Sequence, residues 1–294
     1  MMSHPGECRE AYSTSMHGFT LIELLLVIII LGIGAALTTG FITNPFKAFT
    51  DMSRRAALTD QADTALYRMT REIRQSLPNS VRVTSSGSRI AIEFLQTRTA
   101  GRYRLKGAGD KLNLNQHADT FDVLGGLNAA ASVVTGAAGK STCLNGAADC
   151  LVIYNTGTSA TANNAYQGDN VATITSASAN SLGFDNGASS GKAFPLGSPA
   201  QRFYVVSRSV SFVCDLASGR LLRFAGYGLK AAQPINDADF GVGGFLVTDS
   251  LNSCSFTYTP GTNSRNGVAV LNLGLAKSGE QIVLLEQVHI FNSP

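Results

Sequence analysis

The sequence lacks the excess of one charge sign that marks a nucleic-acid or anionic-membrane partner. Its 294 residues include 23 basic and 20 acidic residues, giving a formal net charge of +3. Charged residues amount to only 15%, below the usual quarter, and tryptophan is absent. Gly, Ser, Thr, Asn and Ala are plentiful instead. This composition favours an exported, turn-rich β protein over a cytosolic helical one, and 44% hydrophobic residues are enough for a core.

Histidines and closely spaced cysteines are also scarce. No two cysteines have C-x-x-C spacing, and only His117 and His289 lie beyond the first seventeen residues. These absences argue against a zinc site and favour two disulfides formed in an oxidising compartment. The five cysteines are Cys8, Cys143, Cys150, Cys214 and Cys254. We expect the segment that contains Cys8 to be removed, which leaves an even number.

The spacing of the other four cysteines predicts a pairing. Cys143 and Cys150 enclose the short loop CLNGAADC, so we expect a disulfide between them. Cys214 and Cys254 lie in the strand-like segments SFVCD and SCSFTY, and they can pair if those strands are neighbours.

One long hydrophobic run stands out near the N-terminus. No residue from Leu24 to Phe46 is charged, and about twenty such residues are enough to cross a bilayer as a helix. Glu23 immediately precedes this uncharged stretch and follows the apolar residues that open the run. An ionised side chain near the centre of such a helix costs about 2.5–3.5 kcal/mol, so a carboxylate in the membrane normally has a partner.

Two ordinary interpretations leave Glu23 without a role. A secretory signal peptide could be cleaved at the small residues Gly32–Gly34, before Ala35. Signal peptides begin with a basic region, however, whereas here Arg9 is outweighed by neighbouring acids. An uncleaved signal anchor is the second alternative. It accounts for the hydrophobic run but not for the carboxylate.

The segment GFTLIEL, Gly18 to Leu24, resembles the cleavage signature of type IV prepilins and type II secretion pseudopilins. The resemblance implies that a membrane peptidase cuts after Gly18 and methylates the new N-terminal residue, Phe19. Glu23 becomes the fifth residue of the mature protein and pairs with the terminal amine of a neighbouring subunit. Such an amine neutralises a carboxylate that lipid would otherwise leave unpaired, and this favours correctly registered neighbours.

After Pro45 the pattern changes to that of an amphipathic helix. Apolar residues recur in steps of three and four from Leu58 to Leu77, and arginines occupy much of the remaining surface. Together with the hydrophobic run, this pattern predicts one helix from about Phe19 to Ser76. Acids lie between the arginines and aromatics are few, so we expect a solvated or subunit-facing surface rather than a nucleic-acid site.

The rest of the chain reads as strands and loops. Apolar residues alternate on both sides of a turn at Ser85–Ser88, which predicts a hairpin. Further strands are expected in GRYRL, FDVL and CLVIY, and in a series of segments from Gln201 to the C-terminus. Between Gly125 and Ala200, apart from CLVIY, small polar residues predict surface loops. Antiparallel strands packed against one amphipathic helix predict an α+β fold with no second domain in the head.

Several inner segments resemble minor pilins of the mannose-sensitive haemagglutinin (MSHA) type IV pilus: RRAALTDQADTALYRMTREIRQSLPNSVRV, IEFLQT, GRYRL, FDVLGG, RFYVVSRSVSFVCD and LLRFAGYG. The resemblance implies the type IV pilin fold and a low-abundance subunit that helps to start or cap a fibre used in surface attachment. It implies a leader (1–18), a transmembrane and assembly helix (19–44), an amphipathic helical half (45–77) and a β-rich head (78–294).

The same resemblance implies partners and locations. The partners are major and minor pilins, the prepilin peptidase/methyltransferase, the inner-membrane assembly platform and the membrane, which the chain spans once. Before assembly the protein lies in the inner membrane with its head in the periplasm, and afterwards in the pilus on the cell surface.

No constellation of residues predicts an enzyme, a cofactor or a metal site. His4 and His17 precede the expected cut, His117 lies in a polar loop, and His289 lies in an apolar strand. The segment NDAD, residues 236–239, offers oxygens but lacks the later glycine and glutamate of a calcium loop, so we expect a turn. Two alternative functions stay open: a J-type pseudopilin of type II secretion, and a glycan-binding adhesin at the pilus tip. Among the aromatic-poor loops, an adhesin would have Tyr166, Phe184 and Phe194 available.

Overall fold

A computed structural model describes residues 18–159, 163–187, 192–261 and 265–291, apart from the side chains of residues 39–45. Most of the expected leader, with Cys8, His4 and His17, lies outside these residues. The chain divides into two units, residues 1–53 and residues 54–294. Each unit is described by itself below.

A single long helix, α1, runs over Leu21–Ile73 and continues through Pro45. Its bounds lie within a few residues of the expected Phe19–Ser76. The helix ends in a turn in which the amide of Ser76 donates to the carbonyl of Ile73. Pro78 follows, and Asn79 adopts a left-handed backbone with φ +58°, a conformation that asparagine tolerates better than most residues.

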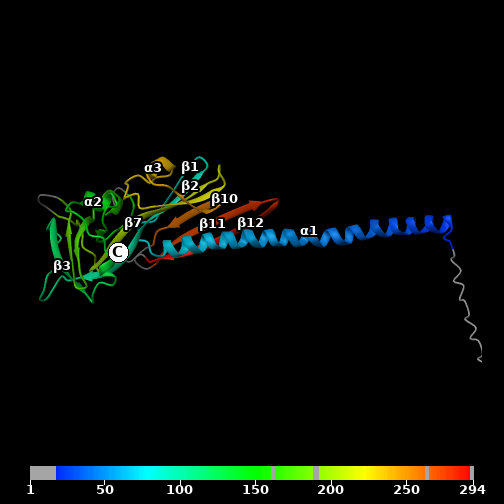
Figure 1. Ribbon diagram of the computed structural model, residues 1–294. Helices are drawn as coiled ribbons and strands as arrows, with labels where there is room; N and C mark the ends of the chain where they lie inside the picture. The colour runs from blue at the N-terminus through cyan, green and yellow to red at the C-terminus, as the bar shows by residue number, and fades with distance from the viewer. Residues whose placement is uncertain (1–17, 160–162, 188–191, 262–264, 292–294) are drawn as a thin grey trace, which may run out of the picture. The chain divides into compact units, whose positions relative to one another are not determined.

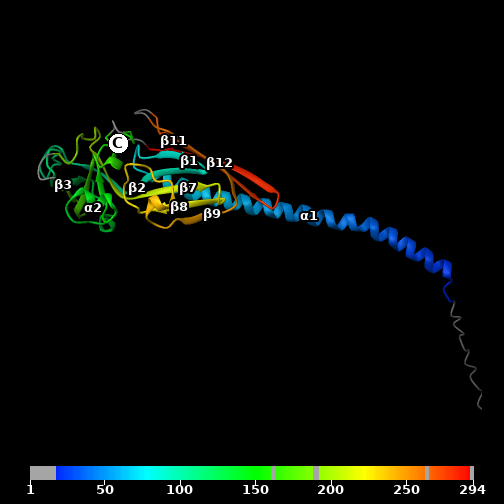
Figure 2. The same ribbon diagram turned by 90° about the horizontal axis from the view of Figure 1, so that it is seen from above.

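The second unit contains a nine-stranded antiparallel sheet in the order β1-β2-β3-β6-β5-β4-β7-β8-β9. Figure 2 labels β1, β2, β3, β7, β8 and β9 of this sheet. The strands are β1 Arg82–Ser86, β2 Arg89–Tyr103, β3 Ala118–Leu124, β4 Cys150–Val152, β5 Val171–Ala177, β6 Ser181–Asp185, β7 Arg202–Asp215, β8 Arg220–Ala225 and β9 Phe245–Thr248. β2 also pairs with β7. This pairing closes a ring of six strands, β2-β3-β6-β5-β4-β7, and each of the six contributes residues to one buried cluster.

A separate three-stranded antiparallel sheet is formed by β10 Leu251–Thr259, β11 Gly267–Lys277 and β12 Glu280–Ile290 (Figure 1). The part of α1 from Leu58 to Ile73 packs against both sheets in one hydrophobic core. The core draws on β2 and β7 of the large sheet and on β10, β11 and β12 of the small sheet. Thus the apolar stripe that predicted an amphipathic helix is buried between two sheets.

The short helical elements lie in connections between strands. They are α2 Lys140–Leu144, α3 Asp237–Phe240 and the 3₁₀ turns Ala130–Ser132 and Ala165–Gln167. The NDAD segment forms a capping box, in which the side chains of Asn236 and Asp239 each bond the other's backbone amide. The side chains of Asn236 and Asp239 are therefore used to start α3, and the carboxylate of Asp237 accepts from Arg89 at 2.7 Å.

The structure agrees with the α+β prediction and with the hairpin, whose strands are β1 and β2. It differs in the middle of the chain, where residues expected in loops form β5 and β6. These strands are rich in Ala, Ser, Thr and Gly, so their apolar alternation is weak in the sequence. GRYRL is also not a separate strand, because its first residues complete the 15-residue β2.

Candidate functional site

The expected processing site lies immediately before α1. Gly18 and Phe19 precede the helix, and the Phe19 side chain is 82% exposed. Thr20 caps the helix, since its carbonyl accepts from the amides of Glu23 at 3.1 Å and Leu24 at 3.2 Å. Its hydroxyl also accepts from the amide of Glu23, at 3.4 Å. The Gly18-Phe19 pair therefore lies outside the helix, and Thr20 caps the first turn.

Glu23 lies in the first turn of α1, where the helix dipole favours a negative charge. Its side chain is exposed, and within the described ranges its carboxylate has no hydrogen-bond or ion-pair partner. The apolar side chains around it are exposed as well, from Leu21 to Leu31. The chain therefore provides the carboxylate but, in the described part, no group to neutralise it.

Residues Leu21–Thr38 form a helix long and apolar enough to cross a membrane, with a mean hydropathy of 2.7. None of this stretch is buried against other parts of the chain that the structure describes. In water so large an exposed apolar surface is unfavourable. The stretch is consistent with membrane anchoring.

Two disulfides fasten the second unit, and they join the pairs predicted from the sequence. Cys143 of α2 is bonded to Cys150 of β4, with Cα atoms 5.1 Å apart, and the bridge closes a short loop. Cys214 of β7 is bonded to Cys254 of β10, with Cα atoms 6.4 Å apart. The second bridge therefore ties the nine-stranded sheet to the three-stranded sheet.

A buried ionic network lies between the hairpin and the loop after β8. Glu93 of β2 has no solvent exposure and accepts from Arg82 of β1 at 2.7 Å and from the hydroxyl of Tyr227 at 2.9 Å. Arg82 also donates to the carbonyls of Lys230 and Ala231, each at 2.7 Å. Burial raises the pKa of Glu93 above its ordinary value of 4.5, and the charge of Arg82 opposes this shift. All these partners are internal, so the network is structural.

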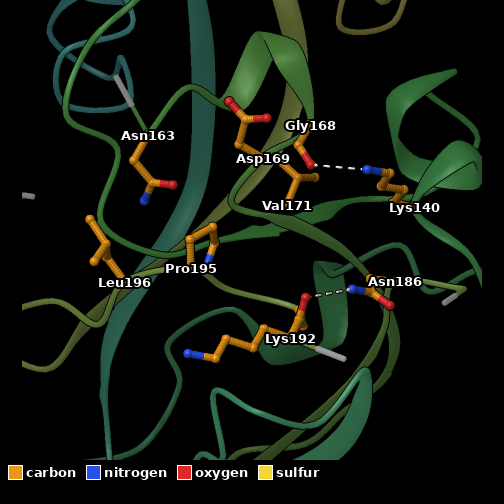
Figure 3. Close-up of a pocket in the computed structure, with 10 residues that line it drawn as sticks. Lys140, Asn163, Gly168, Asp169, Val171, Asn186, Lys192, Pro195 and Leu196 are labelled. Carbon is orange, nitrogen blue, oxygen red and sulfur yellow. Dashed lines mark hydrogen bonds between the residues drawn. The ribbon is translucent and has the colours of Figure 1, made fainter. Parts of the chain in front are cut away.

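A pocket of about 450 Å³ lies beside α2 and the 3₁₀ turn Ala165–Gln167 (Figure 3). Its polar lining comes from Lys140, Asn163, Asp169, Asn186 and Lys192. The Lys140 ammonium donates to the carbonyl of Gly168 at 3.4 Å, and the Asn186 amide donates to the carbonyl of Lys192 at 3.3 Å. Amides, a carboxylate and ammonium groups could hold a small polar ligand. None of the five is a nucleophile held beside a base.

The aromatic residues that an adhesin would present to a sugar are buried. Tyr166 is 3% exposed, Phe184 1% and Phe194 0%, and Phe184 and Phe194 pack against each other with ring centroids 5.2 Å apart. The guanidinium of Arg82 stacks on the ring of Tyr166 at 3.6 Å. These rings therefore stabilise the core rather than forming a binding face.

The two histidines within the described chain belong to no cluster of metal ligands. His117 lies in the loop before β3, and His289 is exposed on β12. Across residues 18–159, 163–187, 192–261 and 265–291, no group of three His, Cys, Asp or Glu side chains could hold a metal ion.

Comparison with known proteins supplies one match. Residues 14–39 match the family model described as the prokaryotic N-terminal methylation motif. No curated protein and no solved structure matches the chain significantly. The matched stretch is therefore prepilin-like, with a methylation motif that leads into an apolar helix. The motif points to a structural pilin rather than an enzyme, and it covers the expected site residues Gly18, Phe19 and Glu23.

The sequence predictions missed a second feature, a groove beside the C-terminal half of α1. It is lined by Tyr67, Arg71 and other α1 residues, by Arg74 in the turn after the helix, and by Glu286 of β12. The arginine-rich surface was expected to be solvated or subunit-facing, but nothing in the sequence placed β12 next to it. The available signal was that Arg71 and Arg74 have no acid four residues further along the helix.

Proposed function

We propose that the chain is a prepilin that is cut after Gly18 and N-methylated on Phe19. The mature protein then consists of a transmembrane and assembly helix (19–44), an amphipathic helical half (45–77) and a β-rich head (78–294) with the type IV pilin fold. The observation that carries the proposal is the methylation motif, which sets an acid at the start of an apolar helix where no described residue pairs with it. In the proposal, the methylated amine of a neighbouring subunit pairs with Glu23.

We further propose that this prepilin is a minor pilin of an MSHA-type pilus, most similar to the MSHA biogenesis protein MshO. Resemblance in the inner segments, from RRAALTDQADTALYRM to LLRFAGYG, supports this assignment. Its role is to help start or cap a fibre used in surface attachment. Its partners are other major and minor pilins, the peptidase/methyltransferase and the inner-membrane assembly platform. The head lies in the periplasm before assembly and on the cell surface afterwards.

Replacing Glu23 tests the assembly role. Glu23→Ala removes a charge that is costly in lipid, so membrane insertion and folding of the head should be preserved. The attraction to the neighbour's amine is lost, so we expect about tenfold fewer surface pili and weaker attachment, with normal amounts of protein in the inner membrane. Pili are counted by electron microscopy, and the protein is measured in membrane fractions.

Two further variants at the same position separate charge from shape. Glu23→Gln keeps the size but not the charge and should behave like Glu23→Ala, whereas Glu23→Asp should restore part of the piliation. Loss of protein export with normal piliation would favour the J-type pseudopilin instead. Normal fibres with lost glycan binding would favour the adhesin. Normal piliation, export and adhesion in Glu23→Ala cells would contradict the proposed role of this residue.

A further inference from the structure

The free edge of the three-stranded sheet has few of the usual protections against pairing with another strand: it carries the charges of Glu280 and Glu286 but no bulge, proline or lysine. β12 is eleven residues long and, among the described strands, pairs only with β11. All eleven of its residues are in continuous register with β11, without a bulge. The strand EQIVLLEQVHI contains no proline, lysine or arginine, the residues with which proteins commonly guard such edges. Val283 and Leu285 on its outer face are 54% and 56% exposed.

The helix beside this edge leaves a groove open. The edge groove, about 440 Å³, is lined by Asp63, Leu66, Tyr67, Thr70 and Arg71 of α1, by Arg74 and Gln75 of the turn that follows it, and by Glu286 of β12. Asp63, Tyr67 and Arg71 recur in steps of four residues, so they lie along one face of the helix, and Arg74 follows three residues later. One wall of the edge groove is therefore a helix stripe, and the other includes an edge strand with unpaired backbone groups.

Polar groups in the edge groove lack partners. The guanidinium groups of Arg71 and Arg74 make no ion pair or hydrogen bond with any residue that the structure describes. Other arginines of α1 do have acids, since Arg55 pairs with Glu280 and Arg68 with Glu72. Thr70, only 6% exposed, also lines the edge groove, and its buried hydroxyl has no hydrogen-bond partner in this part of the chain. The arginine end of the edge groove therefore offers unused donors.

We propose that β12 and the edge groove form a docking surface for an extended strand of a neighbouring subunit. The strand pairs with the free edge of β12 and places an Asp or Glu carboxylate against Arg71 and Arg74. Backbone hydrogen bonds then supply affinity, as in other cases of strand addition, and the charge pair sets the register. That the partner is a fibre subunit rests on the proposed function. The free edge of β12, the edge groove and the two arginines without described partners are features of the structure and do not depend on that function.

Site-specific photocrosslinking in cells tests the surface. The photoreactive residue p-benzoylphenylalanine replaces Leu285 in the full-length chain, and mass spectrometry identifies the crosslinked peptide. The matched control replaces Ser255, which lies in the same row across the sheet, two strands from Leu285 on the exposed face. We expect Leu285 to crosslink at least tenfold more than Ser255, to an extended segment of another subunit that carries an acidic residue.

Charge reversal tests the role of the arginines. Arg71→Glu with Arg74→Glu should lower the Leu285 crosslink at least tenfold while the circular dichroism spectrum stays unchanged, because neither guanidinium pairs with any residue that the structure describes. Arg208→Glu, at an exposed site on β7, should leave the crosslink unchanged. Replacing the partner's acid by lysine should restore the crosslink to the reversed chain.

The inference is overturned if Leu285 and Ser255 crosslink equally or not at all. It is also overturned if the captured peptide is a helix, or if charge reversal has no effect. The amount of the chain in fibres sheared from the cells is measured separately by immunoblot. Chain present in fibres without a Leu285 crosslink rejects the docking surface and keeps the proposed function. An acidic strand captured by a chain that is never processed or assembled rejects the proposed function and keeps the docking surface.

Discussion

At the scale of single residues, two carboxylates show opposite solutions to a poorly solvated environment. Glu93 is fully buried, and its partners, Arg82 and Tyr227, come from the same chain. Glu23 starts an apolar helix and has no partner within the described chain. An internal partner makes an acid part of the fold, whereas a missing one makes it available to another molecule.

Arg82 opposes the rise that burial causes in the pKa of Glu93, and its removal should produce a pH-dependent loss of stability. Burial raises the pKa of Glu93 and Arg82 opposes the shift, so Arg82→Ala should raise this pKa further. The folded protein then binds a proton that the unfolded chain has released, so stability falls as pH rises above about 4.5. We expect Arg82→Ala to lose about 3–5 kcal/mol at pH 8 and clearly less at pH 5.

Thermal unfolding of the full chain in detergent, followed by circular dichroism at both pH values, measures this effect. Arg208→Ala is the control, because Arg208 is exposed and should change stability little at either pH. An equal loss at pH 5 and pH 8 for Arg82→Ala would mean that Glu93 does not titrate in the folded variant as described.

At the scale of elements, the second unit is organised around the part of α1 from Leu58 to Ile73. This part packs against two sheets. The two sheets are joined covalently by the bond between Cys214 of β7 and Cys254 of β10. Arg223 of β8 adds an ion pair to Glu72 of α1, at 2.8 Å. The disulfide therefore fixes the small sheet, and β12 with it, against the large one.

Removing this disulfide should loosen the small sheet first. Replacing both Cys214 and Cys254 by alanine should cost about 2–4 kcal/mol and speed hydrogen exchange in β10, β11 and β12 more than in β2 or β7. The matched control replaces Cys143 and Cys150, whose bridge closes a short loop, and should affect α2 and β4 instead. Faster exchange in the large sheet, with the small sheet unchanged, would contradict the expectation. Nonreducing peptide mapping checks the pairing itself.

How far the elements could be predicted depended on whether their signal was local. The stripe from Leu58 onward and the β1–β2 hairpin are repeated apolar patterns of one helix or one turn, and both were readable in the sequence. β5 and β6 were not, because Ala, Ser, Thr and Gly fill them and their burial comes from the ring of strands. The separation of β10, β11 and β12 into a second sheet also depends on long-range pairing, which periodicity does not encode.

At the scale of the whole molecule, the processing site and the edge groove also differ in whether a local sequence signal reveals them. Gly18, Phe19 and Glu23 lie within six residues, so a local motif was enough to find them. The edge groove combines α1 with a strand more than two hundred residues later, so only the folded chain reveals it. The prepilin-like motif is therefore local, whereas the proposed docking surface depends on tertiary structure.

The N-terminal residue of the mature protein tests the central claim most directly. Protein recovered from the membranes of cells with an active prepilin peptidase is analysed by intact and N-terminal mass spectrometry. We expect loss of residues 1–18 and a chain that begins with N-methylated Phe19. A first residue of Ala35 would indicate an ordinary signal peptide, and a chain that keeps residues 1–18 would indicate an uncleaved anchor; either result would contradict the account.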